Sequence, residues 1–398
     1  MKAIFLAAVL ASAASPVLAA PSPVEKGPIT ARAPAATACA TAVTLSGNPF
    51  ASRSIYANKF YSSEVAAAAA AMTDTALAAK ATKVADIGTF MWIDTRAKID
   101  IVEDTIKDVP CDQIAALVIY DLPGRDCAAK ASNGELPVGS LSTYKSEYID
   151  PIVAIFKKYP NIAIALIIEP DSLPNLVTNI DLQACKDSAD GYRQGVAYAL
   201  KSLNLPNIAM YIDAGHGGWL GWDANLKPGA QELAAVYKSA GSPAQVRGVS
   251  TNVAGWNAYD QSPGEFASSS DAKYNKAQNE KLYVSMISPE LKTAGMPSQA
   301  IIDTGRNGVT GLRLEWGDWC NVKGAGFGVR PTGNTGNALV DAFVWAKPGG
   351  ESDGTSDSTA TRYDSFCGKA DAYQPSPEAG AWHQAYFEDL VRNAKPAL

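Results

Sequence analysis

Four carboxylate side chains in this chain follow short apolar runs that are typical of buried strands. Asp171 follows residues 163–168 (AIALII), and Asp213 follows 208–212 (IAMYI). Asp126 lies beyond 115–120 (AALVIY), and Asp353 beyond 342–345 (AFVW). Buried carboxyl groups tend to have raised pKa values, which suits a proton donor. Two such groups roughly 6.5–9.5 Å apart can hydrolyse a glycosidic bond with inversion. The four aspartates together therefore predict acid–base hydrolysis. Any one of them alone could equally be an ordinary helix cap or a partner in an ion pair.

Aromatic side chains also gather near these strand ends and in the loops that follow them. Sugar rings stack on Trp and Tyr, which offer a large, rigid surface. A single tryptophan is more often part of a core, but 219–222 (WLGW) in a glycine-rich loop is harder to explain in that way. The candidates for stacking on a sugar are Trp92, Tyr120, Trp219, Trp222 and Trp319.

The elements that must position these side chains alternate between strand and helix. Strands are expected at 84–93, 115–120, 163–168, 208–212, 246–253, 282–287, 300–303 and 342–345, and helices at 62–80, 97–107, 144–158, 190–203 and 231–239. Such alternation predicts parallel βα units in one α/β barrel-like domain. The carboxyl ends of parallel barrel strands meet at one rim, so the acids above are expected to converge there.

Two long segments, 122–143 and 347–381, do not fit this alternation. Loops of that length in a compact domain are usually functional, as lids or binding loops. They would lie over the rim on which the acids are expected.

Composition limits the classes of partner and compartment. The chain has 398 residues, a net charge of -6 and 47% hydrophobic residues. The acidic balance argues against nucleic acid or an anionic membrane as a partner. Residues 1–19 have the features of a secretory signal peptide, and 20–38 those of a short pro-region. The six cysteines are even in number and lack C-x-x-C spacing, which favours disulfides over a metal site. We therefore expect a secreted protein with no metal and no cofactor.

The motifs resemble those of glycoside hydrolase family 6, the secreted cellulases. The similar segments are 118–129 (VIYDLPGRDCAA), 168–173 (IEPDSL), 213–222 (DAGHGGWLGW), 317–321 (GDWCN) and 345–351 (WAKPGGE). Gly124 departs from the family pattern, because many members carry an acid there, and so does Ser352, where relatives can carry a cysteine. The resemblance covers residues 90–387 and implies a distorted β/α barrel with seven parallel strands, a variant of the TIM barrel.

The resemblance also implies roles for individual residues. Asp171 would be the general acid, and Asp126 would support it and raise its pKa. Ser132 and Tyr120 would position the attacking water and the distorted sugar, and Asp353 would be the base or an electrostatic partner. Substrate would be bound by Trp92, Arg125, Asp213, His216, Trp219, Trp222, Asn252, Trp319, Lys347 and Glu351. His216 is expected to have a structural or hydrogen-bonding role and no catalytic one.

Disulfide pairs are implied by the resemblance as well. The family pattern pairs Cys127 with Cys185 and Cys320 with Cys367, which leaves Cys39 and Cys111 for a third bridge. Two of these bridges would anchor the long loops.

Together, these features predict a single catalytic domain over 39–398, without a linker or a carbohydrate-binding module. Its active site would lie in a tunnel formed by the two long loops. We expect a monomer that acts on cellulose and cello-oligosaccharides. It would release cellobiose from non-reducing chain ends by inverting hydrolysis of β-1,4 bonds. The alternative is a family 6 endo-β-1,4-glucanase with an open cleft, and a binding protein without catalysis is a more remote one.

Overall fold

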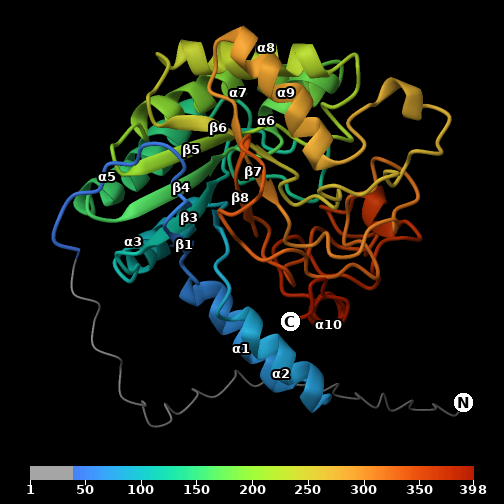
Figure 1. Cartoon of the computed structure of the whole chain (residues 1–398). Coiled ribbons are helices and arrows are strands. Elements are labelled where there is room, and N and C mark those ends of the chain that lie inside the picture. The colour runs from blue at the N-terminus through green and yellow to red at the C-terminus, as the bar shows by residue number, and fades with distance from the viewer. Residues whose placement is uncertain (1–38) are drawn as a thin grey trace, which may run out of the picture. The chain divides into compact units, whose positions relative to one another are not determined.

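A curved parallel sheet organises residues 39–398, the part of the chain that the computed structural model describes (Figure 1). Its strands are β1 (Ser54–Ile55), β2 (Met91–Ile93), β3 (Gln113–Ile119), β4 (Ala163–Ile168), β5 (Ile208–Asp213), β6 (Val246–Thr251), β7 (Gln299–Asp303) and β8 (Val340–Val344). They run in the order β1-β3-β4-β5-β6-β7-β8, and every pair is parallel. The short strands β1 and β2 share one edge of β3, so the sheet has seven strand positions.

Alternate residues of each strand face opposite sides of this sheet, as the pleat requires. In β3, Val118 points into the barrel interior, whereas Leu117 and Ile119 join the outer core. The interior is filled by side chains that include Tyr120, Ile167 and Tyr211. Both faces of the sheet are therefore buried, which explains why its strands read as continuous apolar runs.

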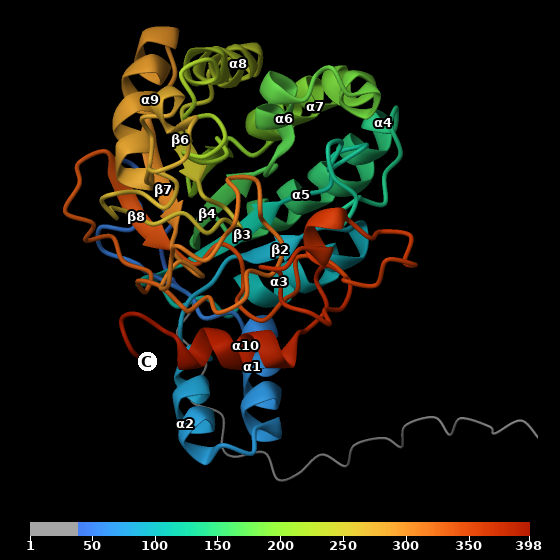
Figure 2. The same cartoon turned by 90° about the vertical axis from the view of Figure 1, so that its right-hand side faces the viewer.

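Helices cover most of the outer face (Figure 2). They are α3 (Asp100–Ile106), α4 (Leu141–Thr143), α5 (Asp150–Lys158), α6 (Ser172–Thr178), α7 (Gln183–Ser202), α8 (Leu226–Ser239) and α9 (Glu280–Ala294), with the π-helical η2 (Tyr144–Ile149) and the 3-10 turn η1 (Arg96–Ile99). Two further 3-10 turns, η3 (Ala272–Tyr274) and η4 (Ser365–Gly368), lie in the segments that follow β6 and β8. The connection between β7 and β8, residues 304–339, lies wholly within the described chain and contains no helix.

The barrel is not closed by strand pairing between β8 and β2. Within residues 39–398, β8 pairs in parallel only with β7, and loop contacts such as Phe90 N–H to Trp345 O at 3.0 Å span the gap toward β2. A separate apolar cluster joins α1 (Lys59–Ala71), α2 (Thr75–Val84) and α10 (Gln384–Arg392). The expectation of a distorted barrel with seven parallel strands is confirmed.

Three local expectations are wrong. The single helix expected at 62–80 is two helices, because Asp74 caps a new one through Ala76 N and Leu77 N. The strand expected at 84–93 is only Met91–Ile93, since Val84 ends α2. The strand expected at 282–287 is part of α9, whose N-cap Asn279 accepts from Leu282 N. A short apolar run does not by itself distinguish a strand from a buried helix.

The three cysteine pairs are confirmed: Cys39–Cys111, Cys127–Cys185 and Cys320–Cys367. The second ties the loop after β3 to α7, and the third ties the β7–β8 connection to the loop after β8. The expected signal peptide and pro-region, 1–19 and 20–38, lie outside the described residues. From Cys39 to Leu398, no helix has both the length and the apolar character needed to cross a membrane.

Candidate active site

Three aspartates converge where β3, β4 and β5 end. The Asp171 N–H, just beyond β4, donates to Oδ2 of Asp213, the last residue of β5, at 3.0 Å. Burial raises the pKa of Asp171 well above its usual range, and the nearby charges of Asp213 and Asp126 raise it further. A carboxyl group in this environment holds its proton at a pH where an ordinary aspartate has lost it.

The backbone that carries these acids is strained. Glu169, Asp171 and Asp126 have φ values of 48°, 64° and 65°, in the left-handed region that non-glycine residues rarely adopt. Each such residue costs on the order of 1–3 kcal/mol and persists only where the surroundings enforce it. The surrounding fold therefore holds Asp171 and Asp126 in backbone conformations that they would seldom adopt alone.

Asp213 is held from two directions. Its Oδ2 also accepts from Gly215 N at 3.2 Å, while its buried Oδ1 has no hydrogen-bond partner among the described residues. Burial raises the Asp213 pKa to about 7. It is thus a second proton-holding group beside Asp171.

Asp126, Ser132, Tyr120 and Arg125 form the adjoining part of the site. Asp126 Oδ2 accepts from Ser132 N at 3.0 Å, and burial raises the Asp126 pKa. The Arg125 guanidinium lies over the Tyr120 ring, with Cζ 4.2 Å from its centroid. Burial and then the Asp126 charge raise the Tyr120 pKa well above its usual range, so this phenol stays neutral.

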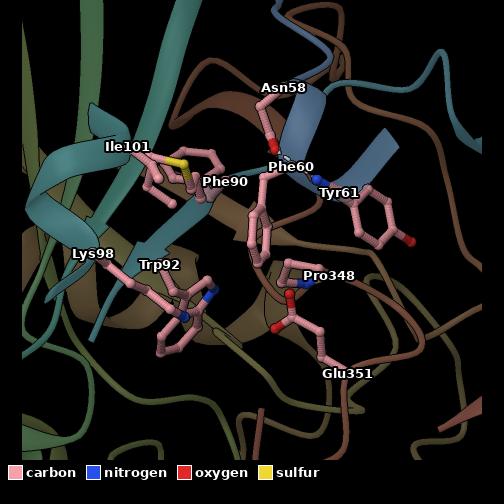
Figure 3. Close-up of a pocket in the computed structure, with 10 residues that line it drawn as sticks. Asn58, Phe60, Tyr61, Phe90, Trp92, Lys98, Ile101, Pro348 and Glu351 are labelled. Carbon is pink, nitrogen blue, oxygen red and sulfur yellow. Dashed lines mark hydrogen bonds between the residues drawn. The ribbon is translucent and has the colours of Figure 1, made fainter. Parts of the chain in front are cut away.

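Trp92 packs against Tyr120 and extends the site. The two rings meet edge to face with centroids 5.0 Å apart, and Trp92 Nε1 donates to Ala346 O at 2.7 Å. Lys347 Nζ lies 5.8 Å from the Trp92 ring and 3.5 Å from Glu351 Oε2. Figure 3 shows Trp92, Glu351 and Phe60 around a small cavity of about 10 Å³, room for roughly one water.

The loop after β5 carries Trp219, Trp222 and His216. Trp219 Nε1 donates to Thr178 Oγ1 at 2.7 Å, and Trp222 Nε1 donates to Gly218 O at 2.8 Å, so both rings are fixed. His216 Nδ1 accepts from Gly218 N at 3.1 Å. Burial, and then the Arg313 charge, lower the His216 pKa to about 3. This imidazole is therefore neutral, and it braces the loop.

Asp353 has a different setting from the other acids. Its two carboxylate oxygens both accept from Arg306 Nη1 at 2.8 Å, and Oδ2 also accepts from Asn321 N at 2.9 Å. Trp319 precedes Asn321 by two positions, and its ring centroid lies 6.0 Å from that of Phe366. Asp353 is an ion-paired carboxylate whose acceptor sites are largely occupied.

Asn252 follows β6 and is completely buried. Its buried side chain donates to Asp303 O at 2.9 Å and to Asn257 O at 3.3 Å. The bond to Asp303 joins the ends of β6 and β7 inside the structure, and the bond to Asn257 holds the loop after β6. The contacts that the structure shows for Asn252 are structural.

Two residues near the site were not anticipated. Asp303 ends β7 and accepts from the N–H groups of Ala346 and Lys347 at 3.1 and 3.0 Å, which fixes the start of the loop that carries Glu351. It follows an apolar strand as Asp213 does, so the same reasoning could have found it. Arg306 carries no such signal, because its partner Asp353 lies 47 positions away in the chain.

Comparison with known proteins identifies the family. The model of the family described as "Glycosyl hydrolases family 6" matches residues 50–394. The chain belongs to this family. It is therefore a glycoside hydrolase, as the motifs indicated.

Named and solved members of family 6 are similar over nearly the whole described chain. The 1,4-beta-D-glucan cellobiohydrolase CEL6C of Podospora anserina is 64% identical over 401 residues, which is 100% of both chains. The catalytic core of the cellobiohydrolase Cel6A from Chaetomium thermophilum is 49% identical, with a TM-score of 0.84 over 88% of this chain and 100% of that one. Cellobiohydrolase II (Cel6A) from Humicola insolens, in complex with glucose and cellotetraose, is 46% identical, with a TM-score of 0.85 and the same coverage.

Buried acids make the stability of this family 6 hydrolase depend on pH. Burial raises the pKa of Asp121 to about 8, and those of Glu169 and Glu64 to about 7. Each of these pKa values is higher than that of the same group in the unfolded chain. These groups therefore bind more protons in the folded state than in the unfolded state between about pH 4 and pH 8. Stability must then fall as pH rises through this window.

We expect the melting temperature to fall by about 5 °C or more from pH 5 to pH 8. Scanning calorimetry at constant ionic strength measures this. Asp121→Asn, which mimics the protonated form, should flatten the dependence. A melting temperature that is constant or higher at pH 8 would contradict the assignment.

Proposed function

We propose that this hydrolase cleaves β-1,4-glucosidic bonds of cellulose with inversion and releases cellobiose from non-reducing chain ends. The Podospora anserina relative is named as a 1,4-beta-D-glucan cellobiohydrolase, and the Humicola insolens enzyme was solved with cellotetraose. The observation that carries the proposal is the convergence of Asp171, Asp213 and Asp126 at the strand ends. There Asp171 has the raised pKa that a proton donor needs.

In this mechanism Asp171 protonates the departing glycosidic oxygen while a water attacks the opposite face of the sugar. Asp126 keeps the proton on Asp171 through its charge and fixes Ser132 through the hydrogen bond to Ser132 N. The neutral hydroxyl of Tyr120 and the Ser132 side chain position the water and the distorted ring. Trp92 and Tyr120 supply apolar ring surface, and Lys347 and Glu351 supply polar groups for sugar hydroxyls.

We assign Asp353 an electrostatic role in preference to that of the base. Arg306 and Asn321 already occupy three of its roughly four acceptor positions, and neutralising one partner of a buried ion pair is costly. Its charge can instead stabilise the positive charge that develops on the sugar ring in the transition state.

Contacts between the two long loops favour exo over endo cleavage. Lys130 N, in the loop after β3, donates to Asp364 Oδ2 in the loop after β8 at 3.2 Å. At Gly354 a Cβ would lie 2.7 Å from Cys367 Sγ and 2.8 Å from Ala131 Cβ, so only glycine permits the loops to approach this closely. Loops in contact over the strand ends would enclose a glucan chain in a tunnel.

The product profile on cellulose tests this function. Exo cleavage from chain ends should give mainly cellobiose with few new reducing ends on the insoluble material. A mixture of product lengths with many insoluble reducing ends would support the endoglucanase alternative. No turnover at all would overturn the proposal.

The bridge between Cys320 and Cys367 should control exo behaviour. Replacing both cysteines with serine frees the loop after β8, since a disulfide restricts the chain by about 2–4 kcal/mol in typical cases. We expect a lower ratio of soluble to insoluble reducing ends and a relative gain on bulky soluble β-glucans.

The matched control is Cys39→Ser with Cys111→Ser, which removes a bridge elsewhere in the chain. Both variants are compared with the parent at equal folded fraction. If the ratio is unchanged in the Cys320 and Cys367 variant, the bridge serves stability alone and the exo assignment loses one support.

We also propose that the protein is secreted. Three disulfides in one chain favour an oxidising compartment. Detection in the culture medium with an N-terminus near residue 20 or beyond would support this.

A further inference from the structure

A cavity of about 390 Å³ lies on the outer face of the sheet beside β8, away from the catalytic cluster. Its walls come from three segments and one strand residue. They are residues 258–261 after β6, Lys395 near the C-terminus, Phe343 of β8, and five residues of the β7–β8 connection, namely Thr304, Asn307, Gly308, Thr310 and Val329. The volume is in the range of small-molecule sites, about 300–1,000 Å³.

The sheet separates this cavity from the catalytic residues. Phe343 belongs to the outer core, whereas its neighbour Val344 faces the barrel interior together with Tyr120. Since the β7–β8 connection contains no helix, the outer side of Phe343 is covered by Tyr259 instead. The cavity occupies the place where a barrel helix would otherwise pack.

The lining has an aromatic floor with polar groups around it. The Tyr259 and Phe343 rings pack edge to face with centroids 4.6 Å apart, and the Tyr259 hydroxyl accepts from Asn337 Nδ2 at 3.2 Å. The Gln261 amide oxygen accepts from the Thr310 hydroxyl, which fixes the amide while its NH₂ group carries two donors. The half-buried Tyr259 ring is thus held rigidly beside fixed hydrogen-bonding groups.

Charge on the lining is balanced. Asp260 and Lys395 are both exposed and of opposite sign, so the cavity offers no net charge for an anion or a cation. An aromatic ring with amides and hydroxyls, and no net charge, suits a neutral ligand with many hydroxyl groups. A sugar ring has this chemistry, because its C–H face stacks on an aromatic ring and its edge hydrogen-bonds.

We propose that this cavity is a second, non-catalytic site that binds a short segment of β-1,4-glucan. The choice of glucan rests on the proposed function, because the polymer around a working enzyme would be its own substrate. Occupation of the site would tether the enzyme to neighbouring chains while the catalytic cluster works on another. Removing the site should weaken adsorption on insoluble cellulose without slowing cleavage of short soluble substrates.

The test is the number of cellotetraose molecules bound per protein at equilibrium, measured by dialysis up to millimolar concentration. Asp171→Asn is present in every protein of this experiment to prevent turnover. We expect a second, weaker class of site that is lost when Tyr259→Ala and Gln261→Ala are combined. Thr310→Arg, which fills the cavity and leaves the Tyr259–Phe343 contact intact, is the second variant and should lose the same class.

Matched controls keep the two hypotheses separate. With Asp171 restored, both cavity variants should hydrolyse cellotetraose within about twofold of the parent rate, and adsorption on cellulose should fall severalfold. The inference would be overturned if the protein that carries Asp171→Asn alone showed only one class of cellotetraose site. It would also be overturned if a second class survived Thr310→Arg. Absence of cellotetraose hydrolysis by the parent would instead overturn the proposed function, whatever the binding count.

Discussion

Asp171→Asn should lower turnover on cellulose by about 10³-fold while substrate binding is largely retained. Asparagine has the size of aspartate but cannot donate a carboxylic proton, so the leaving glycosidic oxygen would depart as an alkoxide. The backbone N–H of residue 171 would still donate to Asp213, so the local structure should persist.

Substrates with good leaving groups provide the internal control. A cellobioside with a nitrophenyl leaving group needs little protonation, so its rate should fall much less than that on cellulose. The measurement is kcat for both substrates at the pH optimum of the parent. Equal losses on both would mean that residue 171 is not the general acid.

Asp126→Asn should move the alkaline limb of the pH–activity profile to lower pH by about one pH unit. The negative charge of Asp126 is one of the causes that raise the Asp171 pKa, and its removal lets Asp171 lose its proton earlier. Asparagine can still accept the hydrogen bond from Ser132 N, so the loop should keep its position. Activity one pH unit above the parent's limb should fall by about tenfold.

Asp121→Asn is the matched control for this prediction. Asp121 also follows β3, but burial raises its pKa to about 8, so it is already neutral at acidic pH. The alkaline limb of its activity profile should stay close to that of the parent, even though stability changes. An unchanged limb in Asp126→Asn, or an equal displacement in Asp121→Asn, would show that Asp126 does not act through the Asp171 proton.

The sequence was sufficient to predict most of the strands and the rim at which the acids meet. Buried parallel strands leave a strong apolar signal in the sequence, and their carboxyl ends share one edge of the sheet. The proximity of Asp171 and Asp213 could therefore be predicted from the sequence. The same signal misled at 282–287, where a capped helix carries an equally apolar stretch. Periodicity reports burial more reliably than it reports the type of element.

Side-chain partners were the part that could not be predicted. Nothing in the sequence shows that Arg306 reaches Asp353, or that Asn252 turns inward to the carbonyl of Asp303. The first contact depends on how the long segments after β7 and β8 approach each other, and the second on the side-chain direction of a residue just beyond β6. No local preference encodes either. The roles expected of these residues from resemblance alone were therefore less specific than those of the strand-end acids.

Proton NMR of the first product from cellotetraose tests the central claim most directly. If Asp171 protonates the leaving oxygen while water attacks the opposite face, the new reducing end must appear as the α-anomer before mutarotation. Spectra recorded within the first minutes should show α-cellobiose in excess of its equilibrium share. Initial accumulation of the β-anomer would contradict the account.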